Sequence, residues 1–167
     1  MLNTSANIKE PGLNVLPPGV ERYIVNGGGL TGIQILPDDE IEIINNEGNQ
    51  ICEISVFNKE GKSEPAILNL KENKDASEIK KILSKKDENS LVAFRQLKKR
   101  NLDISKSKAS IVFDKNTTWG EKVKIKSKDK CYCIFAAPGT EMLVHEQNPP
   151  TDLTIFIKRS KVAKDKE

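Results

Sequence analysis

The chain has 167 residues, enough for one domain, of which 31% are charged and 37% are hydrophobic. No stretch approaches the roughly 18 consecutive apolar residues of a membrane span, and the first residues lack the basic and apolar regions of a secretory signal peptide. We therefore expect a soluble globular protein without a membrane partner.

Charge is unevenly distributed along the chain. Residues 1–57 carry a net charge of −6 and the remainder carries +9. Only four of the 27 basic residues are arginines, and no strand alternates basic with aromatic residues as a base-stacking surface does. This pattern favours lysines on a solvated surface, and we expect no nucleic-acid partner.

The cysteines indicate a compartment rather than a site. Three cysteines are too few for a disulfide framework, and an odd number cannot pair fully, so the reducing cytoplasm is the expected location. Cys131 and Cys133 would lie on the same side of a strand, but a structural zinc site needs about four ligands. We predict two buried, inert thiols and no metal site.

The first third of the chain is predicted to be β structure after a loop-like lead over 1–15. Ile41 and Ile43 alternate with glutamates, which is typical of a half-buried strand. Residues 45–49 favour a turn, so the strands on either side of it are predicted to form a hairpin. The predicted strands are 20–25, 30–36, 40–43 and 50–57.

Two amphipathic helices are predicted within a helical insertion over about 75–101. The first, over about 76–86, would begin at an acidic N-cap, Asp75, with Glu78 three residues on. Its expected buried residues are Ile79, Ile82 and Leu83. The second begins near residue 89. Its expected apolar stripe is Leu91, Phe94 and Leu97. The polar loop before the insertion could include a brief strand over 66–68.

The β pattern resumes after the helices. Strands are predicted at 110–113, 122–126, 131–137, 142–144 and 153–157. Because these strands do not alternate regularly with helices, the expected fold is mainly β (α+β), an antiparallel barrel or sandwich with a two-helix insertion. We expect a single domain over 16–159 and a charged tail or linker over 160–167.

Few residues carry an obvious chemical motif, and no activated nucleophile is identified. Glu53 and Asp152 lie in apolar strand contexts, where burial would perturb a carboxyl pKa, although solvent-facing positions are the stronger alternative. His145 is the only histidine, and a surface or structural role is favoured over that of a catalytic base. The glycine run 27–29 suits a strand connection better than a phosphate cradle.

Residues 36–53 resemble the signature "turn, strand, D-x-E-G-x-Q-x-x-D, strand" of the urea carboxylase-associated family. Glu53 and Asn45 stand where the family usually has aspartates. Residues 136–139 and 149–153 are similar to the ends of such domains at the N-terminus of folate-dependent aminomethyltransferases, which resemble the glycine-cleavage T-protein.

The resemblance implies an accessory domain or small subunit of an aminomethyltransferase-like system in one-carbon or methylated-amine metabolism. Tetrahydrofolate would then lie on the partner, and no cofactor is assigned to this chain. A metal-dependent hydrolase or deiminase of urea or guanidine metabolism is one alternative, and a small-molecule-binding module is another. The candidate ligand-binding residues are Gln50, Glu53, His145 and Asp152. Gln50 and Glu53 would share a pocket only across a bulge or at a barrel rim.

Overall fold

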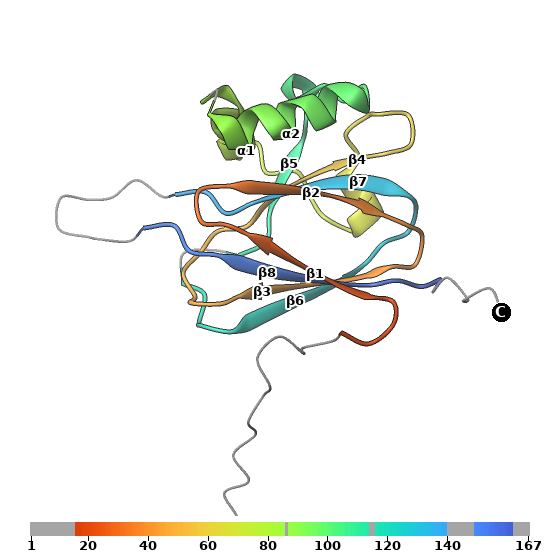
Figure 1. Cartoon of the computed structure of the whole chain (residues 1–167), viewed down its shortest axis with the longest axis vertical. Helices are drawn as coiled ribbons and strands as arrows, with labels where there is room; N and C mark the ends of the chain where they lie inside the picture. The colour runs from red at the N-terminus through yellow and green to blue at the C-terminus, as the bar shows by residue number, and fades with distance from the viewer. Residues whose placement is uncertain (1–15, 86, 114–115, 140–148, 162–167) are drawn as a thin grey trace, which may run out of the picture.

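The fold is a β-sandwich covered on one side by two helices, as seen in a computed structural model that describes residues 16–85, 87–113, 116–139 and 149–161 (Figure 1). The strands are β1 (Val20–Val25), β2 (Leu30–Ile35), β3 (Glu40–Asn45), β4 (Glu53–Phe57), β5 (Ala109–Ile111), β6 (Glu121–Lys126), β7 (Cys131–Ala136) and β8 (Leu153–Lys158). The helices are α1 (Glu78–Ser84) and α2 (Glu88–Lys99), and a short 3₁₀ helix spans Pro65–Leu68.

The strands form two four-stranded antiparallel sheets. One sheet has the order β1-β8-β3-β6, and the other has the order β2-β7-β4-β5. The strands of the described residues pair within two separate sheets. Of the two predicted alternatives, barrel and sandwich, the structure therefore confirms the sandwich. β1 and β2 are consecutive in the chain, yet each is the edge strand of a different sheet.

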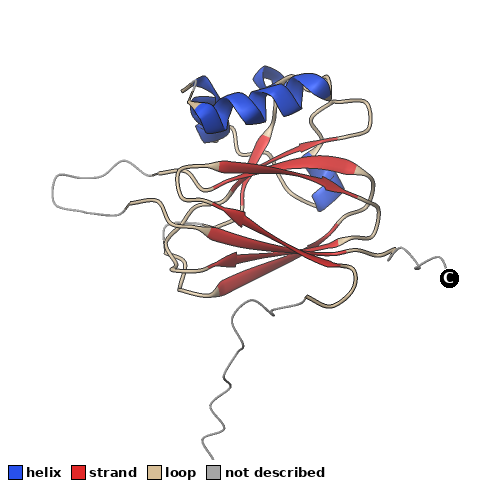
Figure 2. Cartoon of the chain, viewed as in Figure 1, coloured by secondary structure: helices blue, strands red, loops and turns tan. Residues whose placement is uncertain are grey.

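The two sheets and the helices are stacked as three layers (Figure 2), and an apolar layer lies at each of the two interfaces between them. The larger layer lies between the sheets and includes Ile41 and Ile43, which share the buried face of β3 as predicted. The smaller layer lies between the second sheet and the helices. Its buried members are Phe57, Ile79, Ile82, Leu83, Leu97, Ile134 and Ala136.

Both faces of β4 and β7 are covered, so the residues of these strands do not alternate between buried and exposed. In β7, Cys133 and Phe135 contact the inner core, whereas Ile134 and Ala136 contact the helical layer. The same arrangement buries all five residues of β4, including Glu53. The helices therefore bury the outer face of the second sheet.

The predicted hairpin between residues 40–43 and 50–57 is wrong. β3 pairs with β6 and β8, whereas β4 pairs with β5 and β7 in the other sheet. The connection crosses from one sheet to the other, and buried Asn45 stabilises it by donating a hydrogen bond to the Gln50 carbonyl at 2.8 Å. The strand predicted over 50–57 accordingly begins only at Glu53.

The helices confirm the predicted insertion but differ from it in detail. Asp75 is not the N-cap of α1; the cap is Ser77, whose side chain makes no capping hydrogen bond. In α2, Leu97 is buried, but Leu91 and Phe94 are 43% and 50% exposed, so the predicted stripe is wrong. The helix is rotated so that Ala93 packs against the smaller apolar layer together with Leu97.

One more prediction is wrong, and three others concern residues that the structure does not describe. Residues 66–68 belong to the 3₁₀ helix rather than to a strand. The strand predicted over 142–144, the lead over 1–15 and most of the tail after 160 lie outside the described residues. Within the part of the chain that the structure describes, no helix is both long and apolar enough to span a bilayer.

Candidate functional site

Gln50 is buried, and its side chain joins three backbone segments. Its Nε2 donates to the carbonyl oxygens of Ile51 at 2.9 Å and Pro138 at 2.8 Å. Its Oε1 accepts from the Thr151 N–H at 2.8 Å. Pro138 and Thr151 flank the chain that carries His145, so Gln50 holds the two ends of that segment together.

Glu53 is buried, at 2% exposure, on the helix-facing side of β4. Its Oε2 accepts a hydrogen bond from the Glu78 N–H at 2.9 Å, so this carboxylate caps the first turn of α1 in place of Ser77. Burial raises the pKa of Glu53, and hydrogen bonds from the Ile79 and Glu78 N–H groups offset part of that rise. The solvent-facing alternative is therefore wrong for Glu53.

Asp152 is exposed, and its carboxylate links the glycine run 27–29 to the start of β8. Its Oδ1 accepts from the Gly27 N–H at 2.8 Å. Gly28 donates to Ala137 and Gly29 donates to Asn26, so all three glycine N–H groups already have partners in the protein. The glycine run serves as a strand connection here, as the sequence favoured, and it offers no vacant N–H cradle for phosphate.

The structure brings Gln50, Glu53 and Asp152 to the same end of the sandwich, but not into one pocket. Gln50 and Asp152 bind the backbone of neighbouring segments, whereas Glu53 faces a cavity of about 590 Å³ beside α1. His145 lies outside the described residues. The three described candidates thus share a structural role in joining segments that are distant in the sequence.

The cysteines are free thiols in the inner core. The Sγ atoms of Cys131 and Cys133 lie 3.6 Å apart on the same side of β7, as their spacing predicted. Burial raises the pKa of Cys52 and of Cys133, which disfavours reactive thiolates there, while the hydrogen bond from Cys133 lowers the pKa of Cys131. Among the described residues, no three His, Cys, Asp or Glu side chains are grouped as metal ligands.

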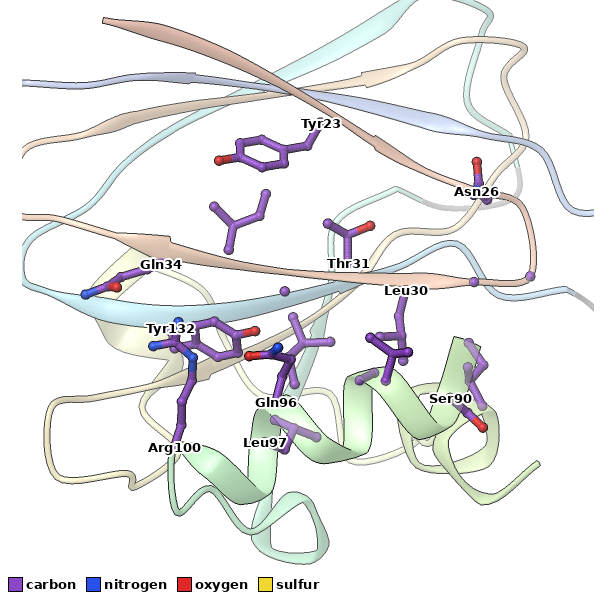
Figure 3. Close-up of a pocket in the computed structure, with 18 of the residues that line it drawn as sticks. Tyr23, Asn26, Leu30, Thr31, Gln34, Ser90, Gln96, Leu97, Arg100 and Tyr132 are labelled. Carbon is purple, nitrogen blue, oxygen red and sulfur yellow. The ribbon is translucent and has the colours of Figure 1, made fainter. Parts of the chain in front are cut away.

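Another cavity lies along the free edge of β2, and none of the candidate residues Gln50, Glu53 and Asp152 lines it. Its volume is about 620 Å³, within the range of about 300–1,000 Å³ of small-molecule sites. One wall is the face of β2 and β7, the opposite wall is α2, and the cavity extends around the edge of β2 towards Tyr23 (Figure 3). Arg159 also contacts it, but its guanidinium is bound to Glu21, Asp39 and the Gln34 carbonyl.

Tyr132 and Arg100 form the most distinctive pair in this cavity. The Arg100 guanidinium carbon lies 4.3 Å from the centroid of the Tyr132 ring, a cation–π arrangement. Tyr132 packs over Gly32 so closely that a Cβ at that position would lie 2.0 Å from the phenol oxygen. A glycine within a predicted strand is a sequence signal of such an approach, and it could have indicated this cavity.

The comparisons with known proteins give one relative. No protein-family model matches the chain. Over 154 residues it is 32% identical to the trimethylamine-oxide aldolase of Ruegeria pomeroyi (strain ATCC 700808 / DSM 15171 / DSS-3). The match covers 92% of this chain but only 19% of the relative, so the chain spans about a fifth of that protein's length. The chain thus resembles one part of a protein of methylated-amine metabolism, and the resemblance to the urea carboxylase-associated family stays a prediction.

Proposed function

We propose that this chain is an accessory domain or small subunit of an enzyme system that acts on methylated amines. The observation that carries the proposal is the match of 92% of the chain to a segment forming 19% of the trimethylamine-oxide aldolase. A fold unit that accounts for a fifth of such a polypeptide works beside other domains. The partner we propose is a folate-dependent aminomethyltransferase-like domain or subunit, which would hold the tetrahydrofolate.

The contacts of the predicted site residues support an accessory role. Gln50, Glu53 and Asp152 each bind backbone groups of this chain, in contacts that position strands and a helix. Side chains that bind the backbone in this way stabilise the fold, and the groups that make these contacts are not available to bind a substrate. The three unpaired thiols suit the reducing cytoplasm, which is the location we propose.

Two alternatives from the sequence have different standing. The small-molecule-binding module has a specific observation in its favour, the cavity of about 620 Å³ along β2, and it is compatible with an accessory role. The hydrolase or deiminase of urea or guanidine metabolism stays a prediction.

Native purification tests the accessory role. An affinity tag on the chromosomal copy in the host of this chain would capture whatever assembly or longer polypeptide contains it. Proton NMR would then follow the methyl signal of trimethylamine oxide incubated with the captured material, with the recombinant 167-residue chain as the control. We expect the captured material, but not the isolated chain, to consume the substrate.

Two results would refute this role. Consumption of trimethylamine oxide by the recombinant chain alone would make it a catalytic domain. The second result is captured material that does not consume trimethylamine oxide although the cell extract does. It would show that the chain takes no part in trimethylamine oxide consumption.

A further inference from the structure

Two cavities meet at the Arg100–Tyr132 pair. The larger, of about 620 Å³, runs between β2 and α2, and a smaller one of about 320 Å³ lies on the other side of the pair. Both are lined by Gln34, Arg100 and Tyr132. The stacked pair therefore belongs to both cavities, and the Arg100 cation lines each of them.

We propose that the two cavities form a single binding site for a small amphipathic carboxylate, with its anionic group on Arg100 and its apolar body between α2 and β2. A guanidinium presents its N–H donors in the plane of the group, in a fork that matches a carboxylate. Stacking on Tyr132 occupies one face of that plane, and no carboxylate of the described residues is paired with Arg100. This proposal rests on the cavity alone and is independent of the accessory role.

The charges around the pair favour an anion. In the described part of the chain, Arg100 and Lys130 have no carboxylate partner, and both line the smaller cavity. Lys59, in the same cavity, is bound to Asp129 at 3.2 Å. The cationic end of the site is thus the smaller cavity and its boundary with the larger one.

The larger cavity supplies an apolar wall and a few polar groups. Figure 3 shows Leu30 facing α2, and the Gln96 amide lying beside Tyr132 and Arg100. An apolar surface with a small number of convergent polar groups is the usual composition of a small-molecule site. Further apolar lining comes from Ile82 of α1, from Val92, Ala93 and Leu97 of α2, and from Ile134 of β7.

Gly32 determines the position of the phenol ring and hence the shape of the site. An added Cβ would lie 2.0 Å from the Tyr132 hydroxyl oxygen and 2.7 Å from the carbon that bears it, so the ring would have to move. Movement of the ring would take away the surface on which Arg100 stacks. Gly32→Ala is therefore expected to weaken carboxylate binding without removing any charge.

Two matched probes test the proposal: 2-naphthoate, which has an apolar body and one carboxylate, and its neutral analogue 2-naphthamide. Each is titrated into the ¹⁵N-labelled full chain, and amide shifts are followed by NMR. We expect saturable binding of 2-naphthoate with shifts centred on Gly32, Gln96 and Arg100, and binding of 2-naphthamide that is about tenfold weaker or more.

Matched variants locate the contact. Arg100→Ala is expected to weaken 2-naphthoate binding about tenfold or more, whereas Arg95→Ala removes the same charge from the exposed surface of α2 and is expected to leave it unchanged. Amide spectra of both variants verify that the fold persists. Equal affinity for the two probes, an unchanged affinity after Arg100→Ala, shifts centred elsewhere, or no shifts at millimolar probe would each overturn the proposal.

Discussion

Arg159→Met is expected to destabilise the fold strongly, because Arg159 joins both sheets at the end of β8. Its Nη1 donates to Asp39 at 2.7 Å and to the Gln34 carbonyl at 2.9 Å, and its other nitrogens bind Glu21. The Arg159 side chain is 17% exposed and that of Asp39 is fully buried. Met keeps the length of the side chain and removes its charge and all of its donors.

The magnitude follows from the burial of Asp39. Removing one partner of a buried ion pair costs about 3–5 kcal/mol, because the remaining charge is left uncompensated in the interior. Asp39 would retain hydrogen bonds from the N–H groups of Leu36 and Ser160 and from the Ser160 hydroxyl, which favours the lower end of that range. We therefore expect a loss of about 3 kcal/mol in the free energy of unfolding.

Urea unfolding followed by circular dichroism measures the loss directly. In a chain of this size a loss of about 3 kcal/mol corresponds to a decrease in Tm of about 6–12 °C. The control is Arg22→Met on the exposed side of β1, expected to change the stability by less than about 0.5 kcal/mol. A loss below about 1 kcal/mol for Arg159→Met, or equal losses for the two variants, would refute the reasoning about the buried pair.

The same variant changes the response to acid. The hydrogen bond from Arg159 lowers the pKa of Glu21 below its usual value of 4.5, so this contribution is present above that pH and is lost as the pH falls through the lower, folded-state pKa. The wild-type chain should therefore lose stability in that acidic range through Glu21, and the Arg159→Met variant should lose less. An identical acid dependence of the two proteins would contradict the role given to Arg159.

Four further substitutions test individual contacts. Glu53→Gln should raise the free energy of unfolding at neutral pH. Burial raises the pKa of Glu53, so the stabilising contribution of the protonated carboxyl group is lost as the pH rises through the folded-state pKa. A variant that is less stable than wild type in urea unfolding at neutral pH would contradict this. Gln50→Leu should cost about 2–4 kcal/mol in the same assay, because it leaves buried backbone groups unpaired. A cost below about 1 kcal/mol would contradict the role of Gln50 in joining the segments of Pro138 and Thr151. Leu97→Ala should cost about 2–3 kcal/mol and Leu91→Ala less than about 1 kcal/mol, and similar melting temperatures for the two variants would contradict the rotation of α2 that buries Leu97 and exposes Leu91.

Strand and helix positions were predictable because their signals are local. The alternation around Ile41 and Ile43, and the helical spacing of Ile79 and Ile82, each require only that one face be buried, and these faces are buried. The orientation of α2 was not predictable from the same reasoning. Its sequence offers more than one apolar stripe, and contact with the second sheet selects the one that contains Ala93 and Leu97.

Strand pairing was not predictable because the turn signal at 45–49 does not specify which sheet the chain enters next. β4 pairs with β5 and β7, and Gln50 just before it contacts Pro138 and Thr151, which are 88 and 101 residues away in the sequence. The same limit applies to Glu53. The strand pattern favoured a solvent-facing position, which is wrong because β4 is covered on both faces, and its use as the cap of α1 depends on a helix 25 residues away.

The candidate binding site shows how a single local signal can indicate a distant arrangement. Gly32 interrupts a predicted strand, which weakens the strand unless something approaches its backbone closely. Tyr132 is that neighbour, opposite β2 on β7, and its ring supports Arg100 from a third element. A side chain at position 32 would displace the ring, so the glycine is explained by the packing of Tyr132, and the cavity beside it follows from the same packing.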